Sequence, residues 1–311
     1  MRLKIIGSAA GGGFPQWNCN YRLSQSVRTG ANGFRLRTQS SVAASADGIG
    51  WVLFNASPDI RQQIAQTPEL QPSHDGPLRS TPIRAVVLTN ADVDHVAGLL
   101  SLREREPFSI YATAEVLAVL EHNSIFNVLD SELVPRHVLH PGQETGIGDA
   151  RGRQTGVVVE TFTVPGKVAL YLEGSTSPEA DFSSDGGDTI GARIAGDDGR
   201  ALFYIPGCAR IDAALRARLD GATALLFDGT LYTDDEMIMA GVGLKTGRRM
   251  GHIAMSGESG SIAGLAGAAI GRRIFVHINN TNPVLDETSP EHAAVRAKGW
   301  EIAHDGMEVE F

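Results

Sequence analysis

Residues 83–95 read IRAVVLTNADVDH, and the interpretation of the whole chain starts from this stretch. Its first part, Ile83–Leu88, is a continuous apolar run of strand length, which is typical of a strand covered on both faces. The pattern then switches to helical spacing. Two carboxylates and an imidazole, Asp92, Asp94 and His95, therefore lie on a loop held by a buried strand, where several side chains can be aimed at one point.

These three side chains have two interpretations. Oxygen and nitrogen donors of this kind suit Fe(II), Mn(II) or Zn(II), whereas a thiolate-rich structural zinc site is not indicated. Alternatively, Asp92 or Asp94 simply caps a helix that begins near His95. Two aspartates and a histidine directly after an apolar strand favour the metal site.

Further candidates stand at the ends of other predicted strands. His277 closes the apolar run IFVH, and it is explained equally well as a core histidine or as a residue that enters the site. Cys208 could be a buried apolar residue or a metal-facing thiol, and Asp228 could accept a hydrogen bond from a ligating histidine. Their common position at strand ends supports one shared site.

Two other residues are candidates for binding or proton transfer. His252 follows Gly251, which permits a close approach, so it could be a ligand or a general acid or base. Lys167, in VPGK, could hold an anionic substrate group or be an ordinary solvated lysine. Surface positions adequately explain the other histidines, which are His74, His122, His137, His140, His292 and His304.

The hydrophobic pattern predicts an alternation of strands and helices along the whole chain. Strands are expected at 3–7, 42–46, 51–55, 83–88, 157–164, 169–173, 201–205, 224–227, 274–278 and 307–311. Helices are expected near 59–66, 210–219, 261–269 and 290–298, the first of them capped by Ser57-Pro58-Asp59. The polar stretch 174–187 is expected to be a surface loop. This order favours an α/β (α+β) fold, a four-layer αββα sandwich, as a single domain over residues 1–311.

Composition excludes several classes of protein. The formal net charge is 27 − 36 = −9, which argues against a nucleic-acid-binding surface. Two isolated cysteines, Cys19 and Cys208, are typical of a reducing compartment. Neither a secretory signal nor an apolar run of membrane-spanning length is present, so we expect a cytoplasmic protein without a membrane span.

The segment 89–95 resembles the T-H-x-H-x-D-H signature of the metallo-β-lactamase superfamily. Thr89, Asp94 and His95 match the signature, whereas Asn90 and Asp92 replace its two leading histidines.

Later positions also match that superfamily only in part. Lys167 stands where a further histidine follows a Pro-Gly turn, and Cys208 stands where a bridging aspartate is usual. His277 matches the last histidine ligand. The resemblance therefore implies that one of two metal positions is depleted and that a single metal is held by Asp94, His95 and His277, with Asp92 as a possible fourth ligand.

The whole chain resembles, more specifically, the pyrroloquinoline quinone (PQQ) biosynthesis protein B family of this superfamily. The matching segments, in order, are GSAAGGGFPQWNCN, TQSSVA, LFNASPDIRQQI, TNADVDHVAGLLSLRE, VPGKVALYLE, LFDGTLY, MGHIAMSG and HINNTNPVL. So many segments in the right order are far more specific than any single motif.

This resemblance implies an Fe(II)- and O₂-dependent hydroxylase, for which zinc or manganese could replace the iron. The substrate would be the tyrosine-derived ring of a small, cross-linked Glu–Tyr precursor of PQQ. Asp92 would act as a fourth ligand or as the base for the phenol, and His252 would exchange a proton with the substrate. Lys167 is the candidate for substrate binding, while Cys208 and Asp228 would lie just behind the ligands.

Two other functions stay open at this point. One is a non-catalytic carrier that transports PQQ or its precursor toward the periplasm, and the other is a metallohydrolase with one zinc ion. A homodimer and contacts with other PQQ biosynthesis proteins are candidate assemblies. Many members of the family carry C-x-C-x-x-C near the N-terminus, but here Tyr21 and Ser24 accompany a lone Cys19, so we expect that structural zinc to be absent.

Overall fold

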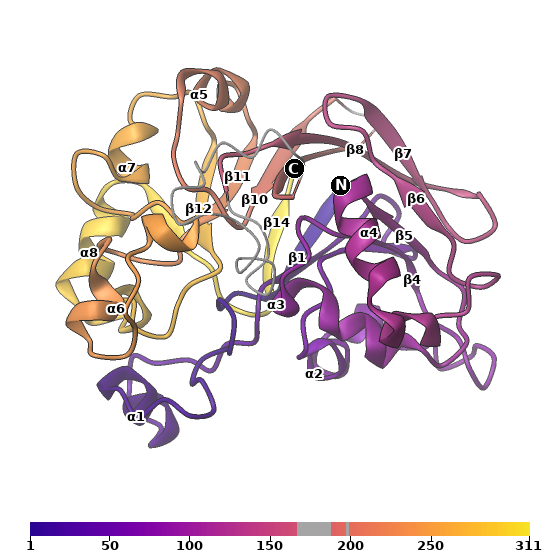
Figure 1. The fold of residues 1–311 in the computed structure, drawn as a ribbon, viewed down its shortest axis with the longest axis horizontal. Coiled ribbons are helices and arrows are strands. Elements are labelled where there is room, and N and C mark those ends of the chain that lie inside the picture. The colour runs from indigo at the N-terminus through magenta and orange to yellow at the C-terminus, as the bar shows by residue number, and fades with distance from the viewer. Residues whose placement is uncertain (167–187, 197–198) are drawn as a thin grey trace.

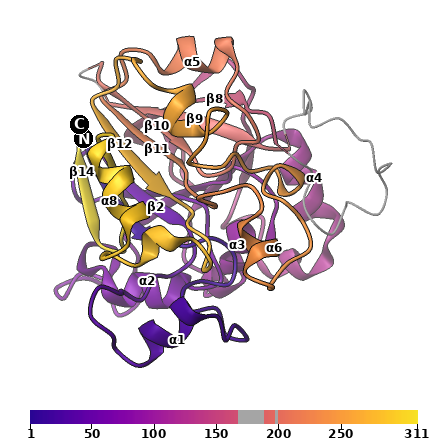
Figure 2. The same ribbon diagram turned by 90° about the vertical axis from the view of Figure 1, so that its left-hand side faces the viewer.

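The computed structural model describes residues 1–166, 188–196 and 199–311, and within these residues two seven-stranded sheets carry the fold. The first sheet has the order β14-β1-β2-β3-β4-β5-β6. Its strands are β1 (Arg2–Gly7), β2 (Ser41–Ser45), β3 (Trp51–Phe54), β4 (Ile83–Val87), β5 (Ser109–Ala112), β6 (Arg136–Val138) and β14 (Met307–Glu310). Because β14 pairs with β1, the two ends of the chain lie side by side (Figures 1 and 2).

The second sheet has the order β13-β12-β11-β10-β9-β8-β7. Its strands are β7 (Glu144–Gly148), β8 (Gln154–Thr163), β9 (Ile190–Ala195), β10 (Ala201–Ile205), β11 (Ala224–Asp228), β12 (Arg272–Val276) and β13 (Trp300–Ile302). Strands β10 to β13 run parallel to one another, so their carboxyl ends meet at one edge of the sheet.

Helices cover the outer faces of both sheets, and this confirms the predicted four-layer αββα sandwich (Figure 1). They are α1 (Arg22–Arg28), α2 (Ile60–Gln66), α3 (Val93–Val96), α4 (Ala114–His122), α5 (Ala213–Leu219), α6 (Glu236–Met239), α7 (Ser261–Gly264) and α8 (Pro290–Ala297). Short 3₁₀ helices are η1 (Pro68–Leu70), η2 (Ala97–Leu102), η3 (Ser124–Val128), η5 (Arg248–Met250) and η6 (Pro283–Leu285).

The apolar run at 83–88 is buried on both faces, as the sequence predicts. Ala85 and Val87 pack into the layer between the two sheets, while Ile83 and Val86 pack against the outer helices. A strand in this position has no solvent-facing side chain to make its sequence alternate. The run therefore delivers the following loop to the edge of the sheet in a fixed orientation.

Two predicted helices differ in detail from the structure. The helix expected near 59–66 begins at Ile60, and Asp59 at its N-cap makes no capping bond, because its carboxylate accepts bonds from the backbone and side chain of Gln39. The helix expected at 261–269 ends at Gly264, and Gly267 beyond it has a positive φ of 73°.

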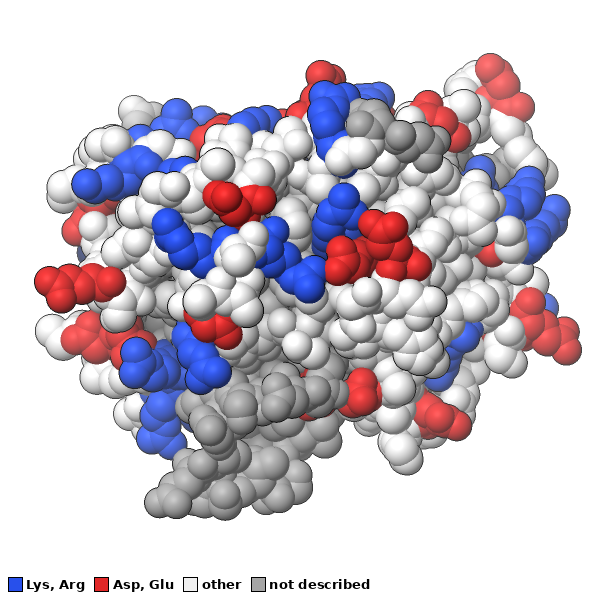
Figure 3. Space-filling model, turned by 90° about the horizontal axis from the view of Figure 1, so that it is seen from above, with Lys and Arg blue, Asp and Glu red and all other residues white. Residues whose placement is uncertain are grey.

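Some sequence predictions concern residues outside the described ranges or are not tested. The strand expected at 169–173 and the loop expected at 174–187 lie outside the described residues, and the single domain over 1–311 stays a prediction. No helix in the described ranges is long and apolar enough to cross a membrane. On the face shown in Figure 3, acidic and basic side chains lie close together.

Candidate metal centre

The loop after β4 presents Asp94 and His95 from the first turn of α3. Asp92 is the N-cap residue of this helix, but its side chain makes no capping hydrogen bond, and Asp94 lies inside the helix. Helix capping therefore accounts for neither carboxylate. Behind the loop, the Thr89 hydroxyl contacts Nδ1 of His95 at 3.4 Å, which leaves Nε2 as the nitrogen that faces the site.

His277 reaches the same point from the other sheet. Strand β12 ends at Val276, and His277 follows it with a left-handed φ of 56°, which is uncommon for a residue with a side chain. Its Nε2 lies 3.2 Å from Oδ2 of Asp94. The strand ends of the two sheets thus bring together residues 183 positions apart in the chain.

Asp94, His95 and His277 form a compact group of donor atoms, all within 4.8 Å of one another. Nε2 of His95 lies 3.8 Å from Oδ2 of Asp94, and this nitrogen is buried and has no hydrogen-bond partner among the described residues. A buried polar atom without a partner is rare and calls for an explanation. The two imidazoles and the carboxylate of this group are a donor set that suits a divalent transition metal.

The pKa shifts of His95 and Asp94 favour the neutral imidazole and the carboxylate that a metal would need, whereas the shift of His277 favours its charged ring. Burial lowers the pKa of His95, which keeps its ring neutral, as a metal ligand must be. Burial alone would raise the pKa of Asp94, but the neighbouring His95 and the hydrogen bond from His277 lower it well below its usual range. Burial opposes charging of His277, yet the hydrogen bond to Asp94 raises its pKa.

A second group, Asp228, His252 and His277, adjoins the first and shares His277 with it. The carboxylate of Asp228 is fully buried and accepts bonds at both oxygens: from the Cys208 amide at 2.9 Å and His252 Nδ1 at 2.8 Å on Oδ2, and from Thr230 on Oδ1. A carboxylate only accepts, so Nδ1 of His252 carries the proton and Nε2 is its basic nitrogen. Asp228 thus accepts a hydrogen bond from a histidine of the site, and its predicted role behind the ligands stays a prediction.

Thr230 is a functional residue that the sequence analysis missed. Its hydroxyl donates to Asp228 at 2.7 Å and lies 3.1 Å from Nδ1 of His252 and 2.9 Å from Nδ1 of His277. The two rings stack, with centroids 5.2 Å apart. The one available signal was a hydroxyl residue directly after strand β11, two positions beyond Asp228.

Cys208 supports the site through its backbone and not through its thiol. The Sγ atom donates to the carbonyl of Arg210 at 3.0 Å, and burial, with the charge of Asp228, raises the pKa of the thiol. Cys208 thus has a neutral thiol packed among apolar side chains, which agrees with its interpretation as a buried apolar residue.

Two predicted residues are not brought into either group. Asp92 is partly buried on the loop before α3, where its charge acts on His95 and His277, but among the described residues it belongs to neither donor group. Lys167 lies outside the described residues. Their predicted roles stay predictions.

The sequence and the structure are similar to those of known proteins. Residues 50–278 match the Beta-lactamase superfamily domain. The chain is 52% identical, over the full length of both proteins, to coenzyme PQQ synthesis protein B of Methylorubrum extorquens strain PA1. It is 54% identical to the protein of the same name from Methylobacterium nodulans, over 99% of each chain. A crystal structure of zinc-bound PqqB from Methylobacterium extorquens matches the whole of both chains, with 51% identity and a TM-score of 0.93.

Proposed function

The chain belongs to the coenzyme PQQ synthesis protein B family of the beta-lactamase superfamily, and from this membership we propose that it is an Fe(II)- and O₂-dependent hydroxylase of PQQ synthesis. Its substrate is the tyrosine-derived ring of a small intermediate in which glutamate and tyrosine are cross-linked. One oxygen atom of O₂ enters the ring, and the other leaves as water with two electrons from an added reductant.

The observation that carries this proposal is the group Asp94, His95 and His277, with the partnerless Nε2 of His95 buried among donor atoms. Two histidines and one carboxylate leave coordination positions open, and Fe(II) bound to such a set supplies the activation of O₂. Zinc and manganese accept the same donors, and the relative from Methylobacterium extorquens was crystallised with zinc.

His252, with Asp92 as a second candidate, is proposed to transfer protons, and Lys167 is proposed to bind the substrate. His252, fixed by Asp228 and Thr230, offers Nε2 as a base to a phenol bound beside the metal. Asp92 is a second candidate for this base, or a fourth ligand. Lys167 is proposed to hold a carboxylate of the substrate.

Oxygen uptake separates the hydroxylase from its alternatives. The protein is loaded with Fe(II) under anaerobic conditions, mixed with the Glu–Tyr-derived intermediate and a reductant, and followed with an oxygen electrode. We expect uptake that requires both iron and intermediate. Binding of the intermediate without oxygen uptake would instead support the carrier, and turnover with zinc in the absence of O₂ would support the hydrolase.

A further inference from the structure

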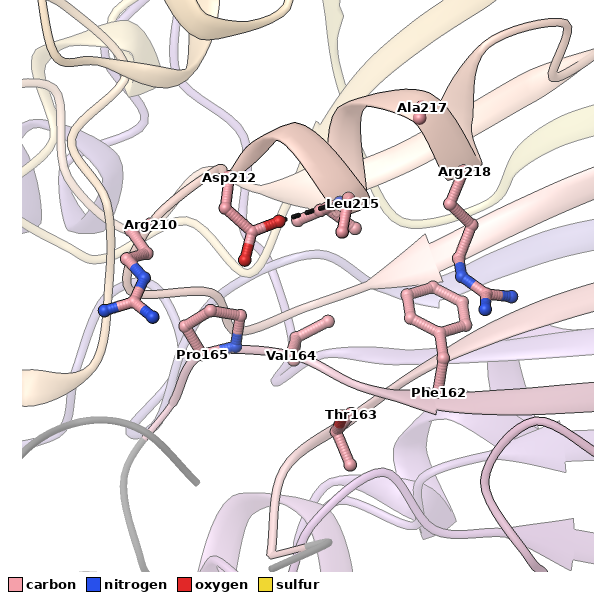
Figure 4. Close-up of a pocket in the computed structure, with 10 residues that line it drawn as sticks. Phe162, Thr163, Val164, Pro165, Arg210, Asp212, Leu215, Ala217 and Arg218 are labelled. Carbon is pink, nitrogen blue, oxygen red and sulfur yellow. Dashed lines mark hydrogen bonds between the residues drawn. The ribbon is translucent and has the colours of Figure 1, made fainter. Parts of the chain in front are cut away.

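A groove with an estimated volume of about 650 Å³ lies between the end of β8 and helix α5 (Figure 4). Val164 and Leu215 give it an apolar floor, and Arg210 and Arg218 stand at its opposite ends. An apolar floor with guanidinium groups at its ends suits an organic anion with an apolar body.

The two arginines are not equivalent. Arg218 pairs with Glu160 at 2.6 Å and lies 4.8 Å from the centre of the Phe162 ring, so its charge is compensated and its position is fixed. Arg210 is exposed, and no carboxylate of the described residues forms an ion pair with it. Among the described residues that line the groove, Asp212 is the one acidic residue, and it uses Oδ1 to cap α5 at the amide of Leu215.

Arg210 is tied to the candidate metal centre through three backbone contacts. Its carbonyl accepts from the Cys208 thiol, and the Cys208 amide donates to Asp228. The Cys208 carbonyl accepts a hydrogen bond from the Ile253 amide at 2.6 Å. Ile253 follows His252 in the chain. The end of β8 is joined to the same segment, because the Ala209 amide donates to Pro165 at 2.6 Å.

The segment that contains Arg210 also lies next to His252. A side chain at Gly207 would meet the ring of His252 at 3.6 Å, so this part of the chain forms a wall of the site. Gly207, beside the ring of His252, and Arg210, at the end of the groove, therefore belong to one short segment, residues 207–210.

We propose that Arg210 binds a carboxylate of an organic acid whose apolar body lies in the groove toward Leu215. A planar guanidinium binds a carboxylate through two parallel hydrogen bonds, which a lysine cannot reproduce. The proposal rests on the proposed function in one respect: the acid is identified with the carboxylate-bearing end of the Glu–Tyr-derived substrate.

The test measures equilibrium binding without turnover, so it does not depend on oxygenase activity. The probes are the Glu–Tyr-derived intermediate and its methyl ester, titrated anaerobically into the full-length protein by calorimetry. The variants are Arg210→Gln and Arg210→Lys. Arg103→Gln serves as the matched control, because Arg103 is another exposed arginine that lies far from the groove in the sequence.

We expect the wild type and Arg103→Gln to bind the free acid at least about 10-fold more tightly than the ester, since a charge-assisted hydrogen bond is roughly twice as strong as a neutral one. Arg210→Gln should bind the free acid and the ester with equal affinity. The preference of Arg210→Lys for the acid should lie between those of the wild type and Arg210→Gln. Metal content and circular dichroism should not change. Equal preference for the acid in the wild type and Arg210→Gln, or no binding to the wild type, would overturn the proposal.

Discussion

His277 joins the two halves of the site, because one nitrogen faces Asp94 and the other contacts Thr230. Removing it or Asp94 takes away one of three donors, and we expect His277→Ala and Asp94→Ala to lose bound iron. Elemental analysis after anaerobic loading measures this directly. His122→Ala is the control, since His122 bonds only to the carbonyl of Ala118 in its own helix. Full iron occupancy in either variant would refute the ligand assignment.

Asp228 acts through His252, and its effect should appear in the rate rather than in metal content. Asp228→Asn replaces a pure acceptor with an amide, which can also present a donor to Nδ1 of His252, so the contact no longer fixes the tautomer of that ring. Loss of such an outer contact usually costs about 10- to 100-fold in activity or metal affinity. We expect kcat to fall within this range while iron still binds, and an unchanged kcat would count against the role of His252.

Substitution of Thr230 tests its hydroxyl, which contacts both His252 and His277. Thr230→Val keeps the shape of the side chain and the backbone bond to Asp228, but it leaves Nδ1 of the buried His277 without its hydroxyl partner, which costs about 1–3 kcal/mol. The free energy of unfolding, measured with denaturant, should fall accordingly. Thr230→Ser should restore most of it, and equal stability of the two variants would show that the hydroxyl is not needed.

The N-terminal loop is held by contacts with helix α1. Helix α1 lies at the edge of the molecule (Figure 1), and its last residue, Arg28, donates to the carbonyls of Gln16, Trp17 and Cys19. Cys19 in turn contacts Asn280, which lies three residues after His277 in the chain. The expected absence of a structural zinc stays a prediction.

Labelling of Cys19 measures how firmly this loop is held. We expect Arg28→Ala to raise the rate at which a thiol reagent modifies Cys19, because the loop loses all the contacts made by the guanidinium. The buried Cys208 should stay unlabelled. Arg22→Ala is the control on the same helix, since Arg22 only stacks over Tyr21. Equal labelling rates in the two variants would contradict this account of the loop.

Strands with an apolar run were the most predictable part of the fold, although the largely buried strands β5, β9 and β13 were not predicted. Strands β4, β10, β11 and β12 carry apolar runs, interrupted by Arg84 in β4 and preceded by Arg272 and Arg273 in β12, and their predicted bounds agree with the structure within about two residues. The edge strands β6 and β7 were missed, because their residues are largely exposed and carry no such run. Sheet pairing, which sets the position of these edges, cannot be read from local sequence.

The candidate site was predictable in its residues but not in its contacts. Asp94 and His95 stand in one motif, whereas His277 had two equal interpretations until the resemblance favoured a ligand. Thr230 has no distinctive spacing, and its role depends on the placement of β11 beside β12. The partnerless Nε2 of His95 is a consequence of packing that no sequence pattern contains.

Stability of the whole molecule should depend on pH through Glu236. Burial raises the pKa of this carboxyl from 4.5 to about 7, although Thr281 and the Tyr232 amide donate bonds to it. Between these values the folded protein keeps a proton that the unfolded chain has lost, so the free energy of unfolding falls as pH rises. Relative to Glu236→Gln, the Tm of the wild type should decline across this window. Parallel Tm curves for the two proteins would contradict the assignment.

The most direct test of the central claim is the origin of the oxygen atom in the product. The Fe(II)-loaded protein is supplied with the Glu–Tyr-derived intermediate, a reductant and ¹⁸O₂, and the product is examined by mass spectrometry. We predict that one ¹⁸O atom from O₂ enters the tyrosine-derived ring and that Asp94→Ala forms no labelled product. A product whose added oxygen comes from water, or an intermediate that binds and is released unchanged, would contradict the account.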